Sequence, residues 1–289
     1  MKKLKNVFFL LFVVVAMASC SSDDSDSVNN NPGNEDQSFT YKLNGQNVPL
    51  TIYGGEISGN DVRVSAGAAD GRSIQLTFNK FGDIYRVTSF STQGSVNSFT
   101  NFNMFKEHHF DFEMVSLNGN QVKANFSGKL YDDEYDLESD FVTVEGSFVI
   151  NLTNIPPPIE GLGVSATVNG SAWHEVEGGT TSGSEYSLFS NSDNEYSFSF
   201  LINPANIAVG NHTFNASSEV NKVVVWKYNT AIGYEEELIS NGGTFNITSK
   251  TTVANFTVIE GTFTVNAVHP ETGAAVNVTN GQFKIAYDF

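Results

Sequence analysis

The chain has 289 residues, with 15 Lys and Arg against 32 Asp and Glu, which gives a formal net charge of −17. So acidic a surface repels nucleic acid and anionic lipid headgroups, so neither is expected as a partner, whereas divalent cations and basic surfaces fit better. The single cysteine, Cys20, leaves no partner for an internal disulfide. Phenylalanine (24) far exceeds methionine (4), and this composition favours strands and turns over helices.

The first twenty residues have the layout of a secretory signal. Lys2, Lys3 and Lys5 precede the apolar run 7–17, and Ala18-Ser19 leads to Cys20. An 11-residue run spans roughly 16 Å as a helix, well short of the ~30 Å hydrocarbon core, so it is a poor permanent membrane span. We expect residues 1–19 to be removed as a signal peptide. Cys20 then becomes a lipidated N-terminus that carries diacylglycerol and palmitate, and the mature charge is −20 because three lysines are lost.

Residues 20–37 are expected to form a disordered acidic tether, because they hold almost no apolar side chain to bury. The run Ser21-Ser-Asp-Asp-Ser-Asp26 resembles the serine- and acid-rich export signal that sends lipoproteins of the Bacteroidota across the outer membrane. This resemblance implies a lipid-anchored protein of the outer membrane that faces the cell exterior. The alternative is a solvated spacer with no role in sorting.

From Phe39 onward, turn residues recur about every ten positions between short alternating runs, which predicts an all-β fold. Three consecutive prolines, within the predicted linker 154–162, cannot belong to an inner strand. We therefore expect two tandem antiparallel β-sandwich (Ig-like) domains, at 38–153 and 163–289. Alternation alone does not separate a two-sheet sandwich from a flattened barrel.

The two predicted domains share sequence features. Asn44-Gly45 opens the first and Asn169-Gly170 opens the second. Near the close, the run 142–150 (VTVEGSFVI) parallels the run 276–285 (VNVTNGQFKI). These similarities predict a tandem duplication with one sandwich in each repeat.

The second domain also resembles a known group of proteins, the small β-rich lipoproteins of uncharacterised function that are common in the Bacteroidota. The resemblance rests on turn glycines and core aromatics: Asn169-Gly170 with Trp173, Gly210 with Phe214, and the runs 243–248, 260–263 and 279–283. It implies a fold and a location. It carries over no catalytic or binding residue.

Two acidic segments are candidate metal sites. Asp132, Glu134, Asp136 and Glu138 alternate as the oxygen ligands of a calcium loop do, although Leu137 occupies the position where an EF-hand has glycine. A solvated hairpin tip is the alternative. In the run 107–113 (EHHFDFE), strand alternation would place Glu107, His109, Asp111 and Glu113 on one face. Same-face neighbours lie about 7 Å apart, so a half-buried strand with a polar outer face is the alternative to a metal site.

Three aromatic residues are candidates for ligand binding. Trp226 and Tyr228 alternate along one strand, and Tyr234 follows the next turn beside Glu235–Glu237. Exposed aromatic rings beside carboxylates suit the stacking of a sugar. The alternative is that these rings fill the core or pair across strands, as large aromatics in sandwiches mostly do.

The motifs of hydrolases and nucleotide-binding enzymes are missing from the sequence. The sequence therefore favours a non-catalytic surface lipoprotein that binds a glycan or a protein partner, with no cofactor other than the calcium considered above. The alternative function is an accessory or structural subunit of the envelope that docks to an outer-membrane complex.

Overall fold

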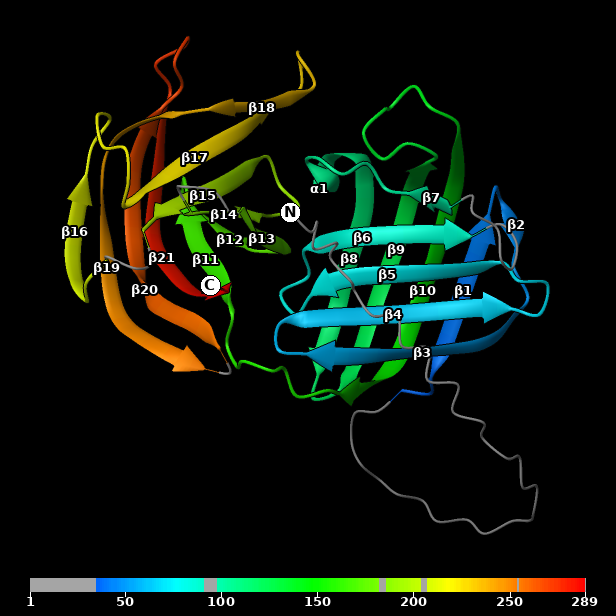
Figure 1. Cartoon of the computed structure of the whole chain (residues 1–289). Coiled ribbons are helices and arrows are strands. Elements are labelled where there is room, and N and C mark those ends of the chain that lie inside the picture. Colours follow the sequence, from blue (N-terminus) through cyan, green and yellow to red (C-terminus); the bar gives the residue numbers. More distant parts are fainter. Residues whose placement is uncertain (1–34, 91–97, 182–185, 204–206, 254, 289) are drawn as a thin grey trace, which may run out of the picture. The chain divides into compact units, whose positions relative to one another are not determined.

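The computed structural model describes residues 35–90, 98–181, 186–203, 207–253 and 255–288 (Figure 1). Within them, helix α1 (Lys106–His109) is the one helix in a succession of strands. The predicted all-β fold of antiparallel sheets is confirmed. Among the described residues, no helix is both long and apolar enough to cross a bilayer. The predicted signal peptide, Cys20 and the tether as far as residue 34 lie outside the described residues.

Sheet A holds the strands of the first half of the chain, in the order β2-β1-β10-β3-β4-β5-β6-β7-β9-β8. Its strands are β1 (Ser38–Leu43), β2 (Gln46–Asn47), β3 (Leu50–Ser58), β4 (Asp61–Ala68), β5 (Ser73–Asn79), β6 (Ile84–Phe90), β7 (Ser98–Thr100), β8 (Phe110–Asn118), β9 (Gln121–Tyr131) and β10 (Phe141–Asn154). In Figure 1, β3–β6 cross in front of β8, β9 and β10.

The long strand β10 joins the two layers of sheet A. It pairs with β9 through residues 141–151 and then with β3, in parallel, through Leu152, Thr153 and Asn154. Strand β7 in turn pairs with β9, so the pairings of the sheet close on themselves. The first half is therefore a flattened, closed sheet, an alternative that the alternation of the sequence left open.

The core of the first half follows from simple alternation. Val62, Val64 and Ala66 on β4 are buried, and the residues between them are exposed. From the other layer, Phe148 stacks against Phe39 with ring centroids 5.4 Å apart. These residues belong to one apolar cluster drawn from both layers, so burial of this cluster holds the layers together.

The last residues of the predicted tether are bound to sheet A. The Glu35 N–H donates to Gln121 Oε1 at 3.0 Å, and the Gln121 amide donates back to the Glu35 carbonyl at 2.9 Å. Lys123 Nζ lies 2.8 Å from the Glu35 carboxylate. The side chain of Gln37 accepts the Asn151 N–H at 2.9 Å. Glu35 and Gln37, which the sequence assigns to the tether, are thus hydrogen-bonded to β9 and β10.

The second half forms two antiparallel sheets. Sheet B has the order β12-β11-β21-β20-β19-β16, and sheet C has the order β13-β14-β15-β17-β18. Their strands are β11 (Gly163–Val168), β12 (Ser171–His174), β13 (Glu177–Thr181), β14 (Tyr186–Asn191), β15 (Tyr196–Ile202), β16 (Gly210–Phe214), β17 (Lys222–Asn229), β18 (Tyr234–Glu237), β19 (Ile239–Val253), β20 (Phe256–Val268) and β21 (Ala275–Asp288).

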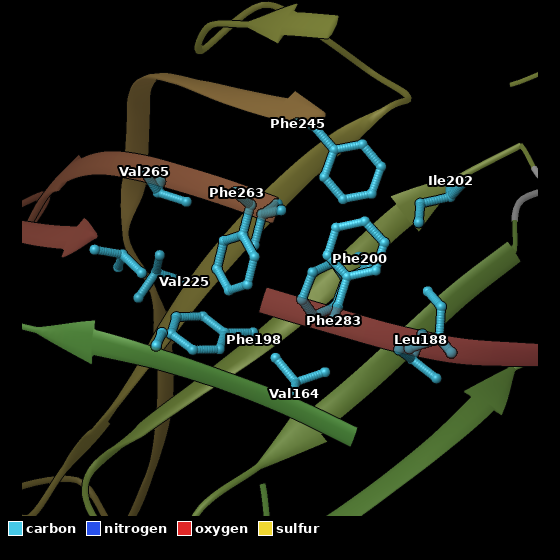
Figure 2. Packing of buried hydrophobic residues seen from close by; sticks show 14 of the residues in the cluster. Val164, Leu188, Phe198, Phe200, Ile202, Val225, Phe245, Phe263, Val265 and Phe283 are labelled. Carbon is cyan, nitrogen blue, oxygen red and sulfur yellow. The ribbon is translucent and has the colours of Figure 1, made fainter. Parts of the chain in front are cut away.

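Phenylalanines from both sheets fill the core of this sandwich (Figure 2). Phe198 and Phe200 come from β15 of sheet C, and Phe245, Phe263 and Phe283 come from β19, β20 and β21 of sheet B. Phe245 and Phe283 stack with centroids 4.8 Å apart, and Phe200 meets Phe263 edge-on at 5.2 Å. Offset and edge-on pairs of this kind add about 0.5–1.5 kcal/mol beyond the area that they bury.

Glycines on the last strand of each half lie under phenylalanines of the neighbouring strand. Gly281 on β21 pairs with Phe263 on β20, and a Cβ at Gly281 would lie 2.5 Å from the Phe263 ring. Gly146 on β10 pairs with Phe126 on β9, and a Cβ there would also lie 2.5 Å from the ring. No real Cβ approaches a neighbour so closely, so the register of these strand pairs requires glycine.

We expect Gly281→Ala to destabilise the chain by about 1–3 kcal/mol, because the added methyl group must displace the Phe263 ring and backbone. The matched control is Gly242→Ala in the same sheet, where the nearest atom to an added Cβ is 3.7 Å away. This control should change the free energy of unfolding by less than about 0.5 kcal/mol. Urea unfolding measures both. Equal effects of the two substitutions would contradict the steric explanation.

Candidate functional site

The outer face of four neighbouring strands in sheet A carries two rows of polar side chains. In the order β8-β9-β10-β1, the residues of each row lie directly opposite one another. Because Phe39, Phe126 and Phe148 on the alternate positions lie in the core, both rows point outward. We call these eight residues the polar face: Asp111, Ser127, Glu145 and Lys42 in one row, and Glu113, Asn125, Ser147 and Thr40 in the other.

All eight residues of the polar face line one hollow of about 1000 Å³. Glu107 and Asp193 contribute further carboxyl groups to its lining. The lining thus holds five acidic residues and a single basic one, Lys42. The hollow therefore disfavours anionic ligands and suits neutral or cationic ones.

Neighbouring side chains orient the polar groups of this face. The Asn125 amide donates to Glu113 Oε2 at 3.1 Å, and Lys42 Nζ donates to Glu145 Oε1 at 2.9 Å. Thr40 and Ser147 join their hydroxyl groups at 3.0 Å. Exposed pairs of this kind contribute only about 0–1 kcal/mol to stability. They place amide, hydroxyl and carboxylate groups side by side on this face.

A second arrangement of polar groups joins the two halves of the chain, and we call it the junction. Asp193, in the turn between β14 and β15, is 8% exposed. Its Oδ2 accepts the Ile84 N–H at 2.9 Å, and its backbone carbonyl accepts the Glu107 N–H at 3.0 Å. Burial raises the pKa of Asp193 to about 7, and the charge of nearby Asp83 adds to the rise.

The contacts around His174 extend the junction. Its ring stacks on Phe81 with centroids 3.9 Å apart, and its Nδ1 lies 3.0 Å from Asp83 Oδ2. The next residue, Glu175, accepts a hydrogen bond from the Asn79 amide on its backbone oxygen at 3.2 Å. Oε2 of Glu175 is shielded from solvent, and desolvation raises the pKa of this carboxyl to about 7, an effect that the Ser190 hydroxyl partly offsets.

Lys106 of α1 is the most deeply buried charged residue of the junction, at 2% exposure. Burial lowers its pKa, and the negative charges of Glu177 and Asp193 oppose this shift. Glu177 also accepts a hydrogen bond from the Tyr85 hydroxyl at 3.2 Å, and burial with this negative charge raises the pKa of Tyr85 to about 12. The junction therefore buries acidic residues next to a basic one, because a charge removed from water needs a partner of opposite charge or hydrogen bonds.

Two of the four carboxylates proposed for calcium have other partners. Both oxygens of Glu134 bind Arg86, at 2.9 and 3.0 Å, and Asp136 Oδ1 accepts the Glu138 N–H at 2.9 Å. Across the described part of the chain, no group of three or more His, Cys, Asp or Glu side chains gathers as a metal ion would need. The structure therefore does not bring Asp132, Glu134, Asp136 and Glu138 together as a metal site.

The aromatic residues proposed to stack on a sugar do not form one platform. Tyr228 is 5% exposed, because Phe102 and Phe105 of the first half cover it with ring centroids 6.4 and 6.2 Å away. Trp226 is partly buried, and its Nε1 donates to Ser199 Oγ at 3.0 Å. Only Tyr234 is well exposed, at 57%. The assignment of Tyr228 to an exposed sugar site is therefore wrong.

The run 107–113 is split between two elements. Glu107 and His109 belong to α1, whereas Asp111 and Glu113 point outward from β8 and join the polar face. The alternation of polar and apolar residues along 111–113 and 143–147 could therefore have predicted the outward rows of the polar face. No sequence pattern predicted the burial of Lys106 and Asp193 at the junction, because a lysine in a polar run and an aspartate in a turn are normally exposed.

The stability of the folded chain should fall as the pH rises through the range set by Asp193 and Glu175. Both pKa values lie near 7 in the folded chain, above the ordinary values of 3.8 and 4.5. Between these limits the folded state holds more protons than the unfolded state, so the stabilisation present below about pH 4 is lost as the pH passes about 7.

We therefore expect Asp193→Asn to lose less stability than the wild type between pH 5 and pH 8, by on the order of 2 kcal/mol. Asparagine keeps an oxygen that accepts the Ile84 N–H but cannot ionise. Urea midpoints at the two pH values measure the difference. Glu219→Gln, at an exposed position, is the matched control. Parallel pH profiles for wild type and Asp193→Asn would contradict the prediction.

Comparisons with known proteins add no functional assignment to this geometry. No family model, no curated protein and no solved structure matches the chain. The polar face and the junction are therefore defined by their own residues and contacts.

Proposed function

We propose that this chain is a non-catalytic, lipid-anchored protein of the outer membrane, facing the cell exterior, that binds a neutral glycan through the polar face. The observation that carries the glycan assignment is the pair of polar rows, whose eight side chains all line one hollow of about 1000 Å³. The anchor assignment rests on the sequence around Cys20 and on the acidic run that follows it.

The chemistry of the polar face supports a ligand rich in hydroxyl groups. Each carboxylate of Asp111, Glu113 and Glu145 can accept several hydrogen bonds, and the Asn125 amide can both donate and accept. Hydroxyl groups of a sugar do both as well, so they can replace the cross-strand hydrogen bonds without leaving a polar group unpaired. The acids of the lining and the net charge of −17 argue against anionic polysaccharides.

A hydrogen-bonded site of this kind is expected to be weak for a single sugar unit. Each exchanged hydrogen bond contributes only about 0.5–1.5 kcal/mol, and association carries its own entropic cost. Display of many anchored copies on one surface would compensate, because linked weak sites gain avidity. The proposed surface location is therefore consistent with a weak site for each sugar unit.

The anchor is tested by Cys20→Ser. The serine protein cannot form the thioether that holds diacylglycerol, so it should leave the membrane fraction and appear as soluble protein. Cell fractionation and immunoblotting measure this, and Ser22→Ala, a neighbouring substitution that keeps the thiol, is the control. Recovery of the Cys20→Ser protein in the membrane fraction would disprove lipidation. Protease treatment of intact cells that left the wild-type protein uncut would disprove surface display.

The glycan site is tested by Asn125→Leu, which removes an amide from the centre of the polar face. We expect at least a tenfold loss of affinity, equivalent to about 1.4 kcal/mol, for oligosaccharides of β-glucan, mannan or xylan in calorimetry. Ser65→Leu, at an exposed position on β4 in the other layer, is the matched control and should bind as the wild type does.

Two results would overturn the glycan assignment. One is the absence of binding to every neutral oligosaccharide of the panel. The other is binding that Asn125→Leu leaves unchanged. Stronger binding to polygalacturonate than to the neutral glycans would contradict the charge argument in particular.

A further inference from the structure

In each half of the chain, the first strand is followed by an Asn-Gly turn that is hydrogen-bonded to the last strand. Asn44 and Asn169 both adopt positive φ, at 50° and 49°. The Asn44 N–H donates to the Thr143 carbonyl at 2.8 Å, and the Thr143 N–H donates back to Asn44 Oδ1 at 2.9 Å. Asn169 and Asn277 exchange the same two hydrogen bonds, both at 2.9 Å. These bonds make β11 the equivalent of β1, and β21 the equivalent of β10.

The glycine–phenylalanine pairs extend this equivalence to a third strand. Gly146 of β10 lies opposite Phe126 of β9, as Gly281 of β21 lies opposite Phe263 of β20. Strand β20 thus corresponds to β9, and β19, its next neighbour, corresponds to β8. Four strands of sheet B therefore have the same order as the four strands that carry the polar face.

The residue after each glycine points outward and belongs to a corresponding polar row. Ser147 follows Gly146, and its row runs through Thr40, Asn125 and Glu113. Gln282 follows Gly281, and its register partners are Ser165 on β11 and Thr262 on β20, with Asn246 next on β19. The outward row of sheet B is thus built from hydroxyl and amide groups, and the row of sheet A combines such groups with the carboxylate of Glu113.

A hollow lies over this row in the second half as well. It measures about 360 Å³, and its lining includes Ser165, Thr262 and Gln282. The ion pair between Lys284 and Glu260, 2.6 Å apart, lies at the same hollow. With Glu175, the lining holds two acids and one lysine, so its charge is closer to neutral than that of the polar face. Its smaller volume suits a shorter stretch of the same class of ligand.

We propose that the outer face of β19-β20-β21-β11 is a second saccharide-binding site, so that each chain binds two segments of neutral glycan. This inference rests on the proposed function of the polar face, because it assigns the same ligand class to the corresponding strands. Two sites on one chain would raise the apparent affinity for a polymer well above that for an oligosaccharide.

The test is the stoichiometry of binding, measured by calorimetry with the neutral oligosaccharide that the wild type binds in the panel of β-glucan, mannan and xylan. The wild type should bind two oligosaccharides per chain. Gln282→Leu and Asn125→Leu should each reduce the number to one, and the double variant should bind none. Asn266→Leu, exposed on the same strand as Thr262 but outside the hollow, is the matched control and should still bind two.

The outcomes separate this inference from the function on which it rests. One oligosaccharide per wild-type chain, lost in Asn125→Leu and unaffected by Gln282→Leu, would overturn the second site and leave the polar face intact. No binding by the wild type would overturn both. Urea midpoints of Gln282→Leu and Asn266→Leu, if equal, show that any loss of binding does not come from unfolding.

Discussion

The register between the last two strands of each half is the constraint on which the rest of the structure depends. It is fixed by glycines that lie under phenylalanine rings, Gly146 under Phe126 and Gly281 under Phe263. A slip of one residue would turn the core phenylalanines outward and the polar row inward. The same pairing therefore determines both which side chains fill the core and which line the hollows. With a single cysteine in the chain, this packing carries the stability that disulfides supply in many secreted domains.

Alternation along single strands could be predicted from the sequence, whereas partners between distant segments could not. The period of two places Phe283, Ile285 and Tyr287 in the core and Gln282 outside it, as the structure has them. The Asn-Gly turns are equally local, because asparagine and glycine tolerate positive φ. The closure of sheet A depends on the short parallel pairing of β10 with β3, nearly 100 residues apart, and nothing in either segment signals it.

The candidate sites show the same division between local pattern and distant contact. Asp111 and Glu113 were placed on an outward face by alternation alone, and they line the hollow. Tyr228 lies outward on its own strand as well, but Phe102 and Phe105 from the other half cover it. Glu134 belongs to an acidic loop that the sequence left as a possible calcium site, but its carboxylate forms an ion pair with Arg86. Lys106 and Asp193 are buried only because the two halves meet at the junction.

The hydrogen bonds of Glu35 and Gln37 give the folded part of the chain a defined point of attachment. Glu35 contacts Gln121 and Lys123 of β9, and Gln37 contacts Asn151 of β10. A force applied to the chain before Glu35 would therefore act on β9 and β10 before it acts on the first residue pair of β1. Strands β9 and β10 are also the two central strands of the polar face. If the proposed anchor and ligand are present, load between them would therefore be carried by the longest strand pairing of sheet A, β9 with β10, and not by the terminal strand β1.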